Sequence, residues 1–97
     1  MNNSNEITLK EAIRQLLEAN PLIKDKINEK KLFEIWEKVM GKMIAKRTQS
    51  ITIKKKVLII EINSASLRSE LSFATEKIKN IINAEFEENI LDEVRIM

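Results

Sequence analysis

The sequence predicts a small two-layer α+β domain in which helices cover one face of a short sheet. Apolar residues recur at helical spacing before residue 46 and after residue 64, whereas residues 50–62 follow a period of two. One glycine and one proline among 97 residues leave little room for irregular loops. The predicted order is α-α-β-β-α-β, in one domain over residues 8–97 that follows a flexible N-terminus at residues 1–7.

The first predicted helix begins at Thr8, which can form a capping box with Glu11. It ends at Asn20–Pro21, because proline disfavours helical geometry in the residue before it. Five apolar residues recur at helical spacing between these ends and form one stripe. They are Leu9, Ala12, Ile13, Leu16 and Leu17.

A short, partly buried connector containing Leu22, Ile23 and Ile27 is expected next. Asn28 is then the predicted N-cap of a second helix that runs to about Lys46. Gly41 falls inside this helix, where a glycine would permit close backbone packing. The helix stripe comprises Leu32, Ile35, Trp36, Val39, Met40 and Met43. Trp36 is predicted to be a core residue.

Two β-rich segments, 50–54 and 57–62, are predicted to form a tight hairpin with Lys54–Lys56 at its tip. A third helix follows, capped by Ser64 or Ser66, and leads to a last strand after a Glu-rich turn. This helix can act as the crossover to a strand parallel to the second one. Its stripe comprises Leu67, Leu71, Ala74, Ile78, Ile81 and Ile82, and the last strand contains Ile90, Val94 and Ile96.

The composition argues against an enzyme. The chain has no Cys and no His, so it lacks thiolate nucleophiles, Cys/His zinc sites and the commonest general base. No catalytic residue, metal site or cofactor is predicted. The longest apolar run, Val57–Ile60, is too short to span a bilayer, and no signal peptide is visible, so a cytoplasmic location without membrane contact is expected.

Charge is distributed unevenly although the net charge is only +2. The stretch from Lys38 to Lys56 has seven Lys or Arg residues and no acidic one, whereas 85–93 has five acidic residues and no basic one. The molecule is therefore polarised along its sequence. The basic residues that are candidates for phosphate contact are Lys42, Lys46, Arg47, Lys54, Lys55 and Lys56.

These basic residues also have purely structural interpretations. Lysines protect sheet edges from aggregation, and cations stabilise a helix C-terminus. Both interpretations of the basic residues remain open at this point. Phe33 and Phe73 lie at or beyond the edges of the helix stripes and are further candidates for a contact surface.

Several segments together resemble the DciA family of bacterial proteins associated with the replicative helicase. The resemblance covers about residues 8–97, and the order and spacing of the segments make it fairly specific. The matching segments are Trp36–Gly41, Ile44–Ala45, Thr48, Val57–Ile62, Ser64–Leu71, Ile81–Asn83 and Val94–Ile96. The family often has glycine in the hairpin and after the third helix, where this chain has lysines and Glu87.

The resemblance implies a KH-like domain and a non-enzymatic role with the replicative DNA helicase during its loading onto DNA. With the basic hairpin, it suggests an adaptor that also binds single-stranded DNA weakly. Two alternatives remain, an RNA-binding KH-like module and a pure protein-interaction domain. The latter could be a homodimer that pairs through the last strand or the apolar connector. The Gly-x-x-Gly loop with which many KH domains hold phosphates is absent from the sequence.

Overall fold

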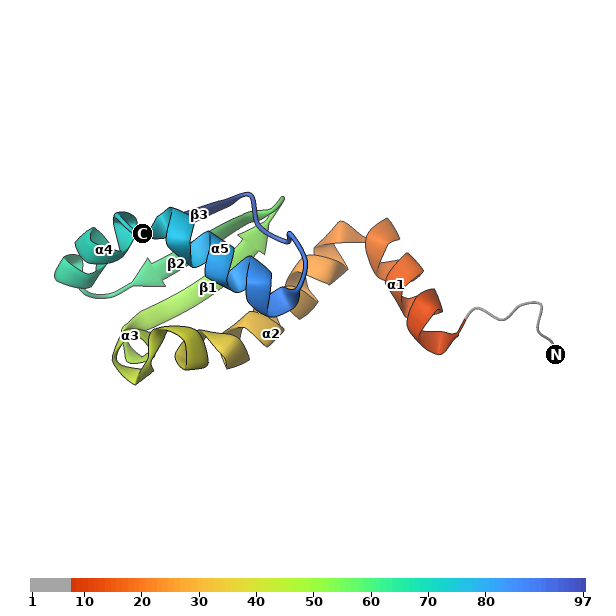
Figure 1. Ribbon diagram of the computed structural model, residues 1–97, viewed down its shortest axis with the longest axis horizontal. Coiled ribbons are helices and arrows are strands. Elements are labelled where there is room, and N and C mark those ends of the chain that lie inside the picture. Colours follow the sequence, from red (N-terminus) through yellow and green to blue (C-terminus); the bar gives the residue numbers. More distant parts are fainter. Residues whose placement is uncertain (1–7) are drawn as a thin grey trace.

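The computed structural model describes residues 8–97, so the expected flexible N-terminus lies outside the described residues. The order is α-α-α-β-β-α-α-β, with helices packed on a three-stranded sheet (Figure 1). The elements are α1 (Leu9–Ala19), α2 (Pro21–Met40), α3 (Lys42–Lys46), β1 (Thr48–Lys54), β2 (Val57–Ile62), α4 (Ala65–Ser72), α5 (Thr75–Phe86) and β3 (Glu93–Ile96). The predicted α+β class is confirmed.

The sheet has the order β1-β2-β3. β1 and β2 are antiparallel, and β2 and β3 are parallel, with Leu58 opposite Val94 in the register. The chain reaches β3 from β2 through α4 and α5, so the predicted helical crossover is confirmed. At the outer edge of β1, the Ile53 N–H donates to the Glu29 carboxylate of α2 at 2.8 Å.

The core lies between the sheet and the helices α2, α4 and α5, and every buried side chain is apolar among the described residues. Trp36 is 2% exposed, so its predicted core position is confirmed. The buried residues are Leu32, Trp36, Ile51, Ile53, Leu58, Ile60, Ile62, Leu71, Ile78, Ile82, Ile90, Leu91 and Val94.

The predicted boundary between the first two helices is half right. The Thr8 hydroxyl accepts from the Glu11 N–H at 3.1 Å, and α1 ends before Asn20, as expected. The connector and the Asn28 cap are wrong, because α2 begins directly at Pro21 and contains Asn28 in its interior. Proline at the first helical position has no N–H to leave unpaired, and no breaker follows before residue 41.

Gly41 ends α2 instead of lying within a longer helix, so that expectation is also wrong. Its φ of 91° is one that residues with a side chain rarely adopt, and this explains the glycine. A Cβ at this position would meet no atom within 4 Å, so close packing is not the reason. The chain then forms the separate short helix α3.

The predicted third helix is in fact two helices, α4 and α5. After α4 the Phe73 and Ala74 N–H groups bond to carbonyls only three residues back, which tightens and ends the helix. Ser64 is the N-cap of α4, as one of the two expected serines. No glycine or proline marks the break, so no local pattern predicts it.

The N-terminal part of the molecule projects from this body. The principal extents are 59 × 23 × 20 Å, and Figure 1 shows α1 beyond the end of the sheet, joined to it by the first half of α2. None of the residues of α1 is buried. We refer to residues 9–27, which comprise α1 and the start of α2, as the elbow, and to residues 28–97 as the body.

Candidate nucleic-acid interface

The tip of the β1–β2 hairpin consists of a two-residue turn, Lys55 and Lys56, between the paired residues Lys54 and Val57. The turn residues have φ values of 52° and 66°. Positive φ at both central residues is the geometry of a type I′ turn, which suits the twist of a hairpin. The predicted tight hairpin is therefore confirmed, although lysine is an unusual residue for this backbone geometry.

All three tip lysines are exposed, but their partners differ. The Lys56 Nζ lies 3.8 Å from the Asp92 carboxylate, and the Lys56 carbonyl accepts from the Asp92 N–H at 2.7 Å. Among residues 8–97, Lys54 and Lys55 have no ion-pair partner. These two ammonium groups are therefore available to an anionic ligand.

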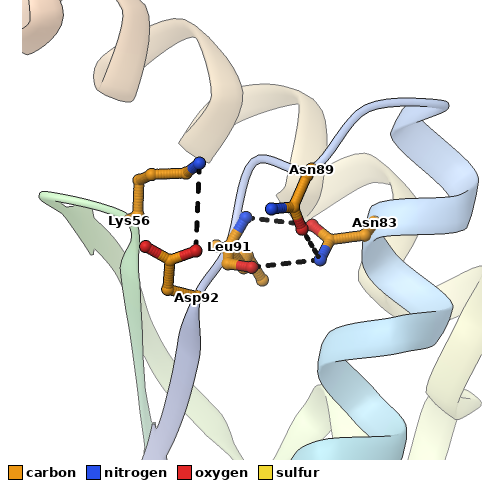
Figure 2. Close-up of polar contacts among 5 residues, drawn as sticks. All are labelled: Lys56, Asn83, Asn89, Leu91 and Asp92. Atoms are coloured by element: carbon orange, nitrogen blue, oxygen red, sulfur yellow. Dashed lines mark hydrogen bonds and ion pairs between the residues drawn. The ribbon is translucent and has the colours of Figure 1, made fainter.

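The loop from α5 to β3 supports the hairpin tip (Figure 2). The Asn83 amide donates to the Leu91 carbonyl at 3.0 Å and to the Asn89 side chain at 2.9 Å. The Leu91 N–H donates back to the Asn83 side-chain oxygen at 2.9 Å. This clamp holds residues 89–91 against α5, so Asp92 is positioned where it meets Lys56.

A second basic group lies at α3 and comprises Lys42, Lys46 and Arg47. All three residues are exposed and have no ion-pair partner within the described part of the chain. A relay of hydrogen bonds anchors the helix that carries them. The Trp36 indole N–H donates to the Thr48 hydroxyl at 2.9 Å, and that hydroxyl donates to the Ile44 carbonyl at 2.8 Å.

The fold does not bring the six predicted basic residues together. α3 precedes β1 and the hairpin tip follows it, so the two groups lie at opposite ends of that strand (Figure 1). A seven-residue strand separates them by about 20 Å. They form two sites of positive charge rather than one cluster.

The acidic segment 85–93 lies beside basic residues instead of on an opposite face. Glu85 pairs with Lys38 at 3.2 Å, and Glu88 pairs with Lys24 at 3.5 Å. Together with the pair at the hairpin tip, these ion pairs neutralise much of the polarisation along the sequence. The charges that remain unpaired in the candidate interface, as far as residues 8–97 are concerned, are those on Lys54, Lys55 and the α3 group.

A groove lies between the elbow and the hairpin tip, and sequence reasoning did not find it. Its volume is about 540 Å³. The hairpin wall carries Lys54–Lys56, and apolar surface comes from Leu17, Pro21, Leu22 and Ile90. Leu22 was expected in a partly buried connector. It is instead 73% exposed and lines this groove.

The resolved pKa shifts in the described part of the chain belong to a surface pair. A hydrogen bond and the positive charge of Arg95 lower the pKa of Glu93, which is an ordinary surface pairing. No group of three acidic side chains within residues 8–97 is arranged to hold a metal ion. No helix of the described part is long and apolar enough to cross a membrane. The arrangement offers exposed positive charge at a tight turn and at a short helix anchored by hydrogen bonds.

Phe33 and Phe73 are 52% and 87% exposed and lie on different elements, α2 and the α4–α5 junction. Their predicted part in a contact surface stays a prediction.

Comparison with known protein families assigns the chain. The family described as Dna[CI] antecedent, DciA, matches residues 8–96. The chain belongs to the DciA family. The resemblance seen in the sequence is therefore confirmed, and DciA proteins are non-enzymatic and associated with loading of the replicative helicase. No curated protein and no solved structure matches the chain.

Proposed function

We propose that this protein is a non-enzymatic adaptor that contacts the replicative DNA helicase during its loading and binds single-stranded DNA weakly. Membership of the DciA family over residues 8–96 is the observation that carries the helicase part of the proposal. The absence of Cys and His from the sequence agrees with an adaptor that does no chemistry of its own.

The DNA part rests on the unpaired positive charge at the two ends of β1. Lys54 and Lys55 lie at the exposed hairpin tip, and Lys42, Lys46 and Arg47 lie on or directly after an anchored short helix. Lysine contacts phosphate as a point charge, so this arrangement favours sequence-independent binding. A flexible single strand can follow an irregular path between two such sites about 20 Å apart.

The turn backbone supports a role for the lysine side chains. Lysines with positive φ cost on the order of 1 kcal/mol each relative to glycine or asparagine. A chain that needed only a stable hairpin would be better served by Asn-Gly in this turn. Edge protection alone does not explain the turn, because charged residues on the strands themselves provide it without positive φ.

Fluorescence anisotropy of labelled single-stranded DNA at several salt concentrations tests the DNA part. We expect weak binding that falls as salt rises, because phosphate binding releases counterions. Changing Lys54, Lys55 and Lys56 to Ser should weaken binding and reduce the salt slope by about 0.7 for each phosphate that the variant no longer neutralises. Substituting the α3 group, with Lys42, Lys46 and Arg47 changed to Ser, should have a similar effect.

A matched control removes the same charge elsewhere. Lys10, Lys30 and Lys77 are exposed and lie on three other helices, so their change to Ser should leave the salt slope nearly unaltered. If the control and the hairpin variant lose the same affinity for DNA, the loss of net charge alone explains the effect of the hairpin substitutions. Duplex DNA and single-stranded RNA serve as parallel ligands, and a marked preference for RNA would favour the RNA-binding alternative.

Co-purification with the replicative helicase tests the other part of the proposal. The complex is expected to form with the full chain across several salt and nucleotide conditions. Failure to form it under all of them would remove the helicase from the proposal, whatever the DNA measurements show.

A further inference from the structure

One side of α1 carries exposed apolar side chains. Leu9 is 78% exposed and Leu16 is 59% exposed, and Ala12 and Ala19 are also exposed. These four residues follow the spacing 3-4-3, which places them on one side of a helix with 3.6 residues per turn. We refer to them as the α1 stripe. An isolated helix of 11 residues is only marginally stable in water. Contact between this apolar surface and a partner is therefore expected to stabilise α1.

The rest of the described chain does not cover the α1 stripe. The smaller groove between α1 and α2 is lined by Ile13 and Leu17, and the larger groove also uses Leu17. No member of the α1 stripe lines either groove, so the stripe faces away from both.

We propose that the α1 stripe pairs with the α1 stripe of a second copy of this chain, with the two helices antiparallel. A two-fold axis near residue 14 would place Leu9 opposite Ala19 of the second copy and Ala12 opposite Leu16 of the second copy. Each layer then joins one large and one small side chain, which is how close-packed helix pairs fill the space between them. A two-fold interface repeats these pairings in both directions.

The residues beside the α1 stripe favour a second copy over a charged partner. Thr8, Gln15 and Asn20 flank the stripe, and none of them carries a charge. Lys10, Arg14 and Glu18 lie toward the opposite side of the helix by its rotation of about 100° per residue. Identical helices can therefore approach without like-charge repulsion, and nothing adjacent to the stripe attracts a polyanion. In an antiparallel pair the positive end of each helix dipole also lies beside the negative end of the other, which is favourable.

The dimer is expected to be weak. A contact between two 11-residue helices is expected to bury less than the roughly 1,000 Å² at which specific interfaces become stable. A dissociation constant on the order of 10–100 µM is therefore expected.

Sedimentation equilibrium of the full chain at about 5–500 µM tests the proposal. The expected result is a reversible monomer–dimer equilibrium, in which Leu16→Glu raises the dissociation constant at least tenfold. Met43→Glu is the matched control, because Met43 is 70% exposed and lies on α3, outside the elbow, and it should leave the equilibrium unchanged. Circular dichroism confirms that each variant is folded. A wild-type monomer throughout, or equal effects of the two substitutions, would overturn the proposal.

Disulfide trapping tests the orientation, since the chain has no cysteine. Gln15 lies beside the proposed two-fold axis, so Gln15→Cys should form a disulfide between copies under mild oxidation. Leu9→Cys should not form a disulfide with the same residue of the second copy in an antiparallel pair. Glu18→Cys, on the far side of the helix, measures the background rate of disulfide formation. Self-linking through Leu9→Cys but not Gln15→Cys would contradict the antiparallel arrangement. This result would stand whether or not the helicase and DNA parts of the proposed function hold.

Discussion

The elbow and the body carry similar apolar patterns but use them in different ways. In the body, apolar residues from helices and strands meet in a core that begins at Leu32. In the elbow, six large apolar side chains remain 47–78% exposed. The radius of gyration, 16.0 Å, exceeds the roughly 13 Å typical of a compact 100-residue domain because the elbow projects. An amphipathic stripe identifies a helix face that is stabilised by apolar contact. It does not show whether that contact is with the same chain or with another molecule.

The two regions should therefore contribute differently to stability and to binding. The body should supply nearly all the free energy of unfolding, whereas the elbow should respond mainly to what binds it. A matched pair of leucine substitutions makes the difference measurable.

The largest expected effect comes from Leu58→Ala. Leu58 is fully buried, so its truncation should reduce the free energy of unfolding by about 3 kcal/mol through lost transfer energy and a new cavity. The matched change Leu16→Ala should cost less than about 0.5 kcal/mol, because that side chain is already mostly in water. Urea unfolding below about 5 µM, where the monomer is expected to dominate, gives both values. Comparable losses of unfolding free energy in the two variants would show that the elbow contributes to stability as the body does.

A smaller loss is expected from Asn83→Ala, which removes the clamp on the loop before β3. The Leu91 N–H and carbonyl both lose their partner in this region, so the free energy of unfolding should fall by about 2 kcal/mol. Asn80→Ala on the same helix is exposed and controls for the higher helix propensity of alanine. Equal changes in the two variants would show that the clamp contributes nothing.

Glu87→Gly should stabilise the body by about 1 kcal/mol, since Glu87 has a φ of 54°. The Glu88 N–H bonds to the Asn83 carbonyl at 3.2 Å, which is the geometry that favours glycine at this helix end. Glu87→Ala removes the same carboxylate without relieving the backbone, so it should bring no gain. Thermal unfolding of the two variants separates backbone relief from charge.

The smallest effect concerns the pair formed by Glu93 and Arg95, whose side chains lie 2.8 Å apart. Because this pairing lowers the pKa of Glu93 in the folded chain, its stabilisation is present above the ordinary glutamate pKa. It is lost as the pH falls through the lowered value. Glu93→Gln should therefore slightly flatten the acid limb of a stability–pH profile and leave neutral pH nearly unchanged. A large loss of stability at neutral pH would contradict a solvent-exposed pair.

Local signals in the sequence predicted most of the elements. Capping by Thr8, the tight hairpin at Lys54–Lys56 and the change of period at β1 each depend on neighbouring residues, so they can be recognised without the fold. The extent of α2 could not be predicted well, since Pro21 can either end a helix or begin one. The Phe73–Ala74 break has no breaker residue, and both helices that it separates pack on β3, so local sequence does not reveal it.

The candidate site was less predictable than the fold. Residue types and spacing gave six basic candidates, whose binding role stays a prediction. The sequence interval between Arg47 and Lys54 does not reveal that a strand holds the two groups of candidates apart. The sequence also does not reveal which basic residues have an ion-pair partner. Asp92, for example, lies next to Lys56 only because β3 pairs with β2. The groove depends on the angle between α1 and α2, which no local pattern encodes.

The Glu29 carboxylate that accepts the Ile53 N–H has a consequence for how the protein can misassemble. Addition of a foreign strand to the sheet needs an unpaired backbone donor, and at this point of β1 the donor is already occupied. Stacking into a fibril requires two open edges on every molecule, one to accept a strand and one to offer the next. Because α2 packs against β1 and Glu29 occupies one of its outward donors, strand addition at this edge is disfavoured, and α2 helps to protect the small sheet against amyloid growth.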